Sequence, residues 1–366
     1  MKKISLIGST GSIGKQVVEI VRRYPDRFKI VALVANGESV EFERQKRELS
    51  PEFSALASQD EERALNLASL ADADIIFNAA GGFAGLKYSL KAVEAGKVLA
   101  LANKETLVCG GDIIMPLAAK TGAKIIPVDS EHSAIWQCLN YKTDTKVKRL
   151  IITASGGAFR NYPPEKLASV TPEQALNHPT WKMGKKITVD SATLMNKGYE
   201  VIEAHVLYGT AYDKIETVIQ PTSIVHSLVE FDDGAVLAQM SYPTMELPIS
   251  LALTYPERIA TTLKPMDFKT PFSLEFLPME RKKYPCFDIA LKCGEAGGIM
   301  PCVLNAADET AVHAFLRGEI AFTDISRVVE KTVSAFKNEA VTSYSQLQDI
   351  NDRAAKVARQ NINKLQ

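Results

Sequence analysis

Hydrophobic residues follow two alternating patterns along residues 1–129. Short apolar runs at 3–8, 29–35 and 74–80 are typical of strands buried on both faces, whereas 15–24 spaces its apolar residues at helical intervals. Strands that alternate with helices in this way form parallel sheets with helices on both faces. We therefore expect a Rossmann-like, doubly wound parallel sheet in this N-terminal region. Its further strands are expected at 53–57, 97–103 and 123–128.

A different pattern begins near Val147. Strand-like segments now dominate, residues 231–236 have the composition of a hairpin turn, and 191–208 has the spacing of one helix. This mixture predicts a central α+β domain over 130–254. Its strands are expected at 148–157, 186–191, 215–220, 223–231 and 235–242.

The last part of the chain contains a proline-rich segment followed by helices. Five prolines fall within 255–285 with little hydrophobic periodicity, which predicts an extended linker. Residues 286–366 return to helical spacing. The expected fold is therefore α/β, with a doubly wound domain at 1–129, an α+β domain at 130–254 and a small C-terminal helical domain at 286–366.

The composition is that of an ordinary globular protein, since 46% of the 366 residues are hydrophobic and 23% are charged. Basic and acidic residues both number 43, so no net charge favours a nucleic-acid or membrane partner. The five cysteines form no C-x-x-C pair, which argues against disulfides or structural zinc and fits a reducing compartment. We expect a cytoplasmic protein, because the sequence shows neither a secretory leader nor an apolar run of membrane-spanning length.

Glycines mark the turn between the first expected strand and the first helix. Gly8, Gly11 and Gly14 would let the backbone approach a phosphate, and the helix N-terminus would bind a pyrophosphate. The spacing predicts a dinucleotide site, with a plain tight turn as the alternative. At the end of the second strand stands Asn36 rather than an acid, which leaves room for a 2′-phosphate. An acid follows and no lysine or arginine stands beside it, so NADP is favoured only weakly.

Two acids follow the expected strand at 123–128. In an extended chain Asp129 and Glu131 would point the same way. Adjacent carboxylates need a shared proton or a cation, and carboxylate ligands favour Mg²⁺ or Mn²⁺. The alternative is that Asp129 or Ser130 simply caps the next helix.

A third carboxylate lies on the polar face of the helix expected in the central domain. Glu200 follows Lys197 and Asn196 by three and four positions, so the three share one face. Gly198 costs such a helix about 1 kcal/mol relative to alanine, which indicates close approach of a ligand or of another element. Glu200 would suit a metal, and Asn196 and Lys197 with Ser191 would suit a phosphate. A surface ion pair is the alternative.

Three further segments have the composition of binding loops. Lys104 follows an expected strand end, where ligands bind in such sheets, with a solvated lysine at a helix start as the alternative. Ser155 precedes paired glycines and would let a hydroxyl and amides bind an anion, with a plain turn as the alternative. Residues 177–186 carry Trp181 and Met183 without periodicity. This suits a lid that excludes water, although a lone tryptophan is more often part of a core.

Six motifs, taken in order, resemble those of the 1-deoxy-D-xylulose 5-phosphate reductoisomerase family. They are GSTGSIG, LANKE, PVDSEH, ASGGAF, HPTWKMGKKITVDSATLMNKG and NAADE, and they extend from Gly8 to Glu309. The resemblance implies NADPH, one divalent metal (Mn²⁺, Mg²⁺ or Co²⁺), a phosphorylated sugar substrate and a homodimer. The implied reaction rearranges and reduces 1-deoxy-D-xylulose 5-phosphate to 2-C-methyl-D-erythritol 4-phosphate, the committed step of the non-mevalonate route to isoprenoid precursors.

Matching these motifs residue by residue assigns the expected site. The implied metal ligands are Asp129, Glu131 and Glu200, and the implied catalytic residues are these three with Lys104 and His178. The implied substrate contacts are Lys104, Ser130, Glu131, Ser155, His178, Trp181, Met183, Ser191, Asn196, Lys197 and Glu200. The expected coenzyme contacts are Gly8, Thr10, Gly11, Ser12, Ile13, Asn36, Gly37, Asn103, Glu105 and Gly184.

The chain departs from the family pattern after the second strand, where the family often has a basic residue. Gly37 and Glu38 stand there, so Ser39 or Arg44 is the candidate partner for the 2′-phosphate. Loops around 58–72 and 140–147 also look short for the family.

Two other classes explain part of the sequence. A metal-independent semialdehyde or homoserine-type dehydrogenase accounts for the glycine turn but not for three acids. A non-catalytic nucleotide sensor does not account for Lys104 and His178.

Overall fold

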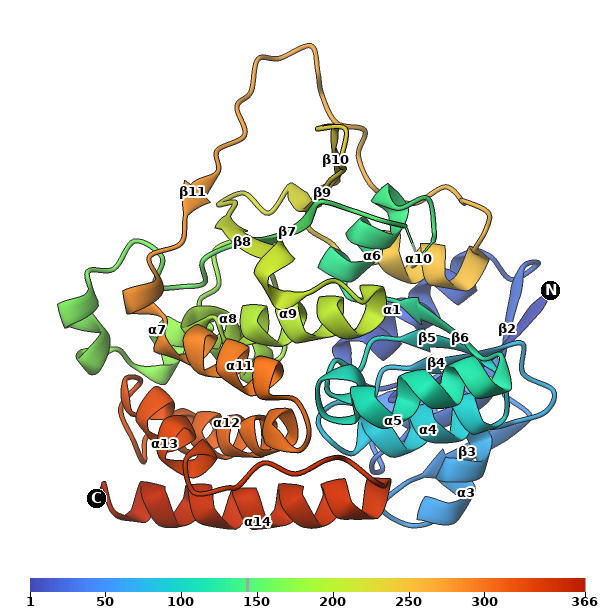
Figure 1. Cartoon of the computed structure of the whole chain (residues 1–366). Helices are drawn as coiled ribbons and strands as arrows, with labels where there is room; N and C mark the ends of the chain where they lie inside the picture. The colour runs from blue at the N-terminus through green and yellow to red at the C-terminus, as the bar shows by residue number, and fades with distance from the viewer. Residues whose placement is uncertain (143–144, 366) are drawn as a thin grey trace. The chain divides into compact units, whose positions relative to one another are not determined.

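The computed structural model describes residues 1–142 and 145–365 (Figure 1). Residues 143 and 144, inside the second of the loops expected to be short, lie outside the described residues, as does residue 366. The chain divides into two compact units. The first contains Met1–Leu107, Gly111–Ser133 and Thr244–Leu263, and the second contains Val108–Gly110, Ala134–Pro243 and the chain from Lys264 onwards.

The first unit contains a six-stranded sheet in the order β3-β2-β1-β4-β5-β6. Each neighbouring pair is parallel, and the strand residues are mostly buried, as near-continuous apolar runs require. This order is that of a Rossmann-type sheet, which confirms the prediction of a doubly wound fold. The strands are β1 (Lys2–Ile7), β2 (Phe28–Ala35), β3 (Phe53–Leu56), β4 (Ile75–Asn78), β5 (Val98–Leu101) and β6 (Lys124–Pro127).

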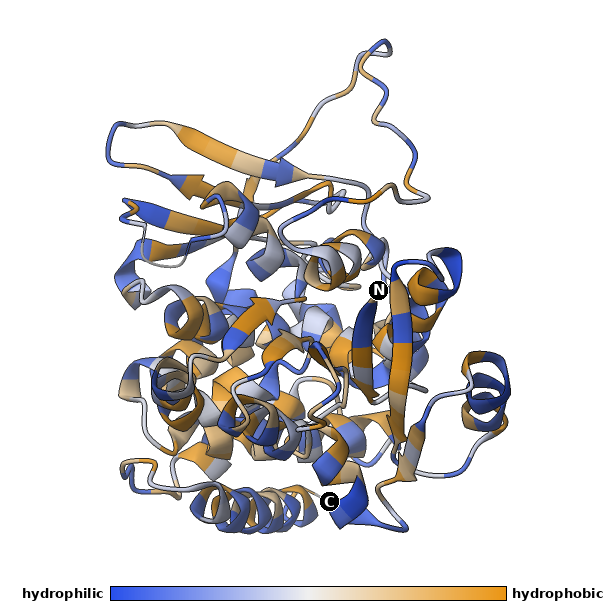
Figure 2. Cartoon of the chain, turned by 90° about the vertical axis from the view of Figure 1, so that its right-hand side faces the viewer, coloured by the Kyte–Doolittle hydropathy of each residue, from blue (hydrophilic) through white to orange (hydrophobic). Residues whose placement is uncertain are grey.

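Helix α1 illustrates why the intervening segments form helices. Its buried Val17, Val18 and Val21 recur at helical spacing, and the exposed Lys15 and Glu19 lie between them. Burying each valine stabilises the unit by roughly 1.5–3 kcal/mol. Figure 2 shows the same contrast along the chain, with hydrophobic residues concentrated in the strands. The helices with residues in this unit are α1 (Ser12–Arg23), α2 (Val40–Leu49), α3 (Glu61–Leu67), α4 (Gly85–Glu94), α5 (Glu105–Thr121), α6 (Ser130–Cys138) and α10 (Glu246–Thr254).

Helix α10 belongs to the first unit although the second sheet separates it from β6 in the sequence. The Lys2 ammonium donates at 3.2 Å to two carbonyls at the C-terminal end of α10, where a cation is favoured. Arg23 of α1 forms an ion pair with Glu246 of α10. The expected domain at 130–254 therefore differs from the structure, because these contacts hold its last residues in the first unit.

The second unit contains a five-stranded mixed sheet in the order β10-β9-β7-β8-β11. β7 and β8 are parallel, and the other pairs are antiparallel. The expected hairpin turn is confirmed, since the Phe231 N–H donates to the Ala235 carbonyl at 2.9 Å and Gly234 adopts a φ of +86°. The strands are β7 (Arg149–Ala154), β8 (Ile215–Ile219), β9 (Val225–Glu230), β10 (Val236–Met240) and β11 (Leu277–Pro278).

Helices make up most of the remainder of the second unit. The expected helical C-terminal region is confirmed by α11 to α14, but it shares a core with the sheet, because Phe287 of α11 packs in one cluster with Val201 of α9 and Ile152 of β7. The α-helices are α7 (Pro172–Leu176), α8 (Lys185–Thr193), α9 (Met195–Tyr208), α11 (Pro285–Ala296), α12 (Met300–Leu316), α13 (Asp324–Val333) and α14 (Tyr344–Asn363). Short 3₁₀ turns lie at η1 (Pro164–Ser169), η2 (Tyr212–Lys214) and η3 (Arg281–Lys283).

Gly198 lies in α9 where this helix packs against α11. A Cβ added at Gly198 would lie 2.3 Å from the Cβ of Ala290. The expectation of a close approach at this glycine is confirmed, and the approaching group is another helix. Figure 1 shows α9 and α11 beside one another within the second unit.

The expected strand at 186–191 is wrong, because these residues lie in α8. Its β-branched residues, such as Val189, favour strands locally, but residues 188–193 are all buried by tertiary packing in the helix. The expected single helix over 191–208 is also interrupted, since Leu194 adopts a φ of +56° between α8 and α9.

The proline-rich segment is only partly an isolated linker. Residues 256–276 contain no helix or strand, as expected, but β11 then joins the second sheet beside β8. The chain therefore divides into two units rather than into the three domains and linker expected.

Candidate active site

The turn between β1 and α1 forms a cradle of backbone groups. Gly8 has a φ of +78°, and a Cβ there would lie 2.5 Å from the backbone of Ala79 at the end of β4, so only glycine fits. Gly14 packs equally closely on the Gly8 carbonyl. No side chain caps α1, so the N–H groups of its first turn remain available to an anion. Of the expected coenzyme contacts in this turn, Gly11 and Ser12 are exposed and Gly8, Thr10 and Ile13 are partly exposed.

Asn103 ties two turns at the carboxyl end of this sheet together. Its Nδ2 donates to the carbonyls of Ala80 and Gly82 at 2.9 and 3.0 Å and to Glu105 at 2.7 Å. Its Oδ1 accepts from Thr106. Asn103 is 2% exposed, so its side chain shapes the turn beside the expected coenzyme contacts.

The loop after β2 is the expected position of the coenzyme's adenosine ribose. Ser39 caps α2, accepting from the Phe42 N–H at 3.1 Å. Arg44 is paired with Glu41 and Glu48 of its own helix. Both candidates for the 2′-phosphate therefore already have partners within α2. Asn36 is exposed, and Gly37 has room for a side chain, since the nearest atom to an added Cβ is 3.7 Å away.

Lys104 and Asp129 meet at the carboxyl end of the first sheet. Lys104 immediately precedes α5, and its ammonium forms an ion pair with the Asp129 carboxylate. Their side chains are 11% and 21% exposed, so the alternative of a solvated lysine is wrong. A cation is thus held beside one of the expected metal-binding acids.

Asp129 also caps helix α6. Its Oδ1 accepts from the Ser130 N–H at 2.9 Å, and its carbonyl accepts from the Ser133 N–H at 2.8 Å. Because α6 begins at Ser130, Glu131 lies in its first turn, and the expectation of an extended chain through both acids is wrong. The Ser130 hydroxyl donates to Glu131 at 2.6 Å. Both acids nevertheless lie at a helix N-terminus, where negative charge is favoured.

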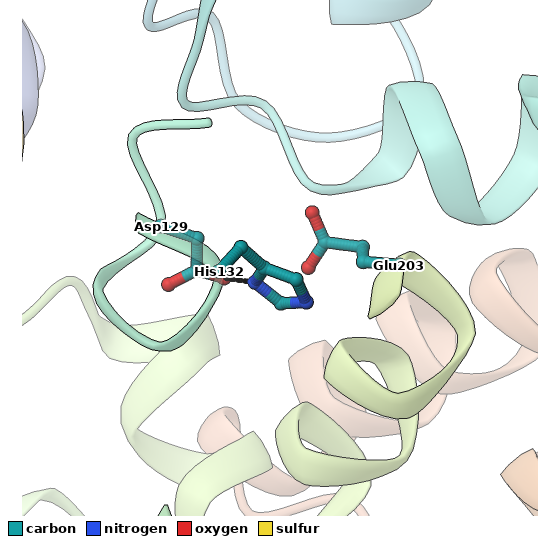
Figure 3. A group of neighbouring side chains, drawn as sticks. All are labelled: Asp129, His132 and Glu203. Carbon is teal, nitrogen blue, oxygen red and sulfur yellow. Dashed lines mark ion pairs between the residues drawn. The ribbon is translucent and has the colours of Figure 1, made fainter. Parts of the chain in front are cut away.

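Sequence reasoning missed two buried residues, His132 and Glu203. His132 Nδ1 lies 3.7 Å from Asp129 Oδ2, as the dashed line in Figure 3 marks. Glu203 extends from α9, also drawn in Figure 3, and is 3% exposed. The signal that could have found them is helical spacing, since each follows an expected metal ligand, Asp129 or Glu200, by three positions.

Glu200 accepts hydrogen bonds from two side chains of its own helix. Asn196 Nδ2 donates to one carboxylate oxygen and Lys197 Nζ to the other. The side chains of Lys197 and Glu200 are 4% and 2% exposed, so the alternative of a surface ion pair is wrong. Glu200 is therefore a buried carboxylate held by a neighbouring ammonium group.

His178 joins the turn after β7 to helix α8. Its Nε2 lies 3.0 Å from Ser155 Oγ and 3.1 Å from Ser191 Oγ. Its Nδ1 accepts from the N–H groups of Thr180 and Trp181 at 3.2 and 2.9 Å. Because Nδ1 accepts, the neutral ring carries its proton on Nε2 and presents it to the serines.

Burial keeps this imidazole neutral. Burial, followed by the charge of Arg160, lowers the pKa of His178 from 6.5 to about 4. The positive φ of Gly157 and its packing against the Ser191 backbone, 2.4 Å from an added Cβ, bring the β7 turn close to α8. The structure thus brings together Ser155, His178 and Ser191, three of the expected substrate contacts.

Residues 177–184 form an irregular loop between α7 and α8. Trp181 is partly exposed and makes an edge contact with the His226 ring at 6.1 Å, so the alternative of a core tryptophan is wrong. Thr180 Oγ1 lies 3.1 Å from Ser223 Oγ. Met183 is partly exposed, and Gly184 ends the loop in open space. This segment has the exposure and the few anchors expected of a lid.

A Rossmann-type sheet with a glycine cradle, joined to a second α+β unit, is typical of the class of two-unit nicotinamide-dependent oxidoreductases. Within that class, the chain belongs to the 1-deoxy-D-xylulose 5-phosphate reductoisomerase family. The family model of that name matches residues 4–66 and 58–111. Models of its C-terminal domains match residues 125–208 and 240–357.

Relatives align over nearly the whole chain. The 1-deoxy-D-xylulose 5-phosphate reductoisomerase of Crocosphaera subtropica is 48% identical, over 96% of this chain and 93% of its own. The enzyme of that name from Thermodesulfovibrio yellowstonii is 44% identical, over 99% of this chain and 100% of its own. A crystal structure of DOX-P reductoisomerase in complex with NADPH, fosmidomycin and magnesium aligns with a TM-score of 0.91 and 35% identity, covering 100% of this chain and 99% of the other. The Zymomonas mobilis enzyme in complex with NADPH aligns with a TM-score of 0.90 and 35% identity, covering 99% of both chains.

Among residues 1–142 and 145–365, no helix combines the length and the apolar character needed to cross a membrane.

Proposed function

We propose that the protein converts 1-deoxy-D-xylulose 5-phosphate to 2-C-methyl-D-erythritol 4-phosphate, using NADPH and a divalent metal, in the synthesis of isoprenoid precursors. The observation that carries the proposal is the match to this family along both units, with identity of 44–48% over almost the full chain. The glycine cradle and the Ser155–His178–Ser191 cluster fit the coenzyme and the phosphate that this reaction needs.

The coenzyme cradle fits a dinucleotide because it combines uncapped helix amides with glycines that a side chain would block. We assign the pyrophosphate to the turn of Thr10, Gly11, Ser12 and Ile13. The Asn103 network would support the nicotinamide end, with Glu105 and Gly184 as further contacts. Asn36 and Gly37 would border the adenosine ribose.

The metal is assigned to Asp129, Glu131 and Glu200. An all-carboxylate set suits Mg²⁺, Mn²⁺ or Co²⁺, and Mg²⁺ is the metal in the similar crystal structure. The fit is supported within each unit by a lysine, because Lys104 contacts Asp129 and Lys197 contacts Glu200. Asp129 and Glu200 therefore each already lie beside a positive charge.

The substrate phosphate is assigned to Ser155, Ser191, Asn196 and Lys197. His178 donates from Nε2 towards this cluster, because its Nδ1 accepts from two backbone N–H groups. When bound, the metal would polarise the ketone and hydroxyl of the substrate, and NADPH would supply the hydride. Lys104 would donate to the developing oxyanion, with Ser130 as a further contact. Trp181 and Met183 would exclude water when the loop closes.

The test is NADPH oxidation that depends on both the sugar phosphate and the metal. We expect turnover with Mg²⁺ or Mn²⁺ and loss of turnover in EDTA, restored by added metal. Full activity in chelator would favour the metal-independent dehydrogenase instead. Coenzyme binding without any turnover would favour the nucleotide sensor.

We further propose a homodimer formed at the free edge of β10. β10 ends the second sheet, and Val236 and Leu237 on it are 48% and 49% exposed. Exposed edge strands are available for pairing with another chain. Exposed aromatic residues of the segment after α10 would add apolar surface to the same interface. They are Phe268, Phe272 and Phe276.

Sedimentation would test the dimer. We expect a dimer for the native chain and a monomer for Leu237→Lys, because a lysine on an edge strand opposes pairing. Val40→Lys, at a site 87% exposed on α2, is the matched control and should remain dimeric. A dimeric Leu237→Lys variant would exclude this surface.

We also propose a cytoplasmic location. None of the five cysteines forms a disulfide in the structure, and four of them are buried, as is typical of proteins from reducing compartments. Fractionation of the native cell would test this.

A further inference from the structure

Lys186 lies in a polar cluster that is separate from the substrate and metal contacts assigned above. Its Nζ is 2.7 Å from Asp190 Oδ2 and 2.9 Å from Asp308 Oδ2. The ammonium also lies 5.0 Å from the centroid of the Tyr199 ring, and the Tyr199 hydroxyl donates to Asp308 Oδ2 at 3.2 Å. Helices α8, α9 and α12 therefore meet at one ammonium group.

This cluster is deeply buried for a charged group. The Asp308 and Asp190 side chains are 0% and 3% exposed, and Lys186 is 22% exposed. Tyr199 is 1% exposed. Two buried carboxylates around one ammonium tolerate little displacement, because a partner that moves away leaves a buried charge uncompensated. The cluster therefore constrains where α8 begins relative to α9 and α12.

Helix α8 has little support from its own sequence. No side chain caps it at Gly184, and its first turn contains no acid. Instead it begins with Lys185 and Lys186 at the positive end of the helix dipole, where cations are unfavourable. The Lys-to-Asp order at i,i+4 is also the weaker orientation for an ion pair. A helix that violates these local rules depends on tertiary contacts for its first turn.

The first turn of α8 is also the C-terminal attachment of the loop 177–184. That loop carries His178, whose Nε2 contacts Ser191 near the other end of α8. The position of the first turn therefore affects the distance between the His178 imidazole and the Ser191 hydroxyl. Tyr199 also connects this cluster to a proposed metal ligand, because it contacts Lys186 and Asp308 and immediately precedes Glu200 on α9.

We propose that Lys186 is a positioning residue, which anchors the C-terminal end of the loop 177–184 through Asp190, Asp308 and Tyr199 so that the loop closes over the substrate phosphate. This inference rests on the proposed function, since the ligand that closes the loop is 1-deoxy-D-xylulose 5-phosphate. Lys186 is not among the substrate and metal contacts assigned above.

The experiment compares Lys186→Met with Lys185→Met, which removes the neighbouring, exposed lysine. We expect Lys186→Met to raise KM for the sugar phosphate and lower kcat, each about tenfold, while the Kd of 2′,5′-ADP stays within about twofold. Trp181 fluorescence, read in a Trp136→Phe background, should lose its response to the sugar phosphate. Lys185→Met should match the native chain, and Lys186→Arg should recover part of the response because it keeps the charge.

A second variant covers the case in which Lys186→Met does not fold. Replacing the whole charged cluster, as Lys186→Met/Asp190→Leu/Asp308→Leu, removes the uncompensated charge and should restore a folded circular-dichroism spectrum. It should still show the raised KM and the lost Trp181 response. Native-like KM in either folded variant would overturn the inference. Absence of turnover in the native chain would instead refute the proposed function.

Discussion

Replacing Glu200 with glutamine removes one negative charge from α9 and leaves the side-chain volume almost unchanged. In the native chain the carboxylate accepts from Asn196 and Lys197, and it is 2% exposed. Glutamine can still accept from Asn196, but the buried ammonium of Lys197 loses its ion pair with this carboxylate. Breaking a buried pair in this way costs about 3–5 kcal/mol of folding free energy.

Turnover should fall more steeply than stability alone explains. The proposed metal loses one of three carboxylate ligands, so we expect kcat with Mg²⁺ or Mn²⁺ to fall at least about a hundredfold. The Kd of NADPH, measured by quenching of protein fluorescence, should change by less than about twofold, because the coenzyme cradle lies in the first unit and Glu200 in the second.

A double variant separates the two effects. Lys197→Met/Glu200→Gln removes both charges and should recover most of the lost unfolding free energy, measured by urea denaturation. Turnover should stay lost, because this variant lacks a proposed phosphate contact as well as a proposed metal ligand. Normal kcat in a folded Glu200→Gln chain would refute the assignment of Glu200 to the metal. Recovery of turnover in the double variant would show that the single variant failed through stability only.

Other substitutions test the local arguments. The pKa of folded His178 is about 4 against an ordinary 6.5, so the unfolded chain binds an extra proton between these values. Stability should therefore fall as pH drops from 6.5 towards 4, and His178→Gln should flatten that part of a plot of melting temperature against pH. Gly37→Arg should raise the kcat/KM preference for NADPH over NADH about tenfold, because Gly37 has room beside Ser58 and an arginine would pair with the 2′-phosphate; an unchanged ratio would place that phosphate elsewhere. Gly198→Ala should destabilise the chain by about 1–3 kcal/mol in urea, since its Cβ would lie 2.3 Å from that of Ala290; unchanged stability would show that α11 can shift freely.

Much of the candidate site was predictable because its residues lie at the ends of strongly patterned elements. The glycine turn follows a buried strand, and its spacing needs no tertiary information. Lys104 and Asp129 follow strands β5 and β6, which parallel pairing brings to one edge of the sheet. Their ion pair follows from that topology.

Other residues were not predictable in the same way. For His132 and Glu203 the sequence offers only their spacing of three positions from the expected metal ligands. Burial distinguishes them from ordinary helix-surface residues, and only the structure shows that burial. The protonation of His178 depends on which groups surround the ring, and those groups lie on three separate segments.

The sequence alone determined the alternation of strands and helices, the parallel, doubly wound class of the first sheet, the β9–β10 hairpin and the six motifs of the family. These features depend on local periodicity and turn chemistry, which act over a few residues. Only the tertiary structure decided that 186–191 forms a helix, that α10 returns to the first unit and that the Lys197–Glu200 pair is buried. Each of these depends on contacts between distant segments, whose desolvation and packing energies outweigh the weak preferences of the local chain.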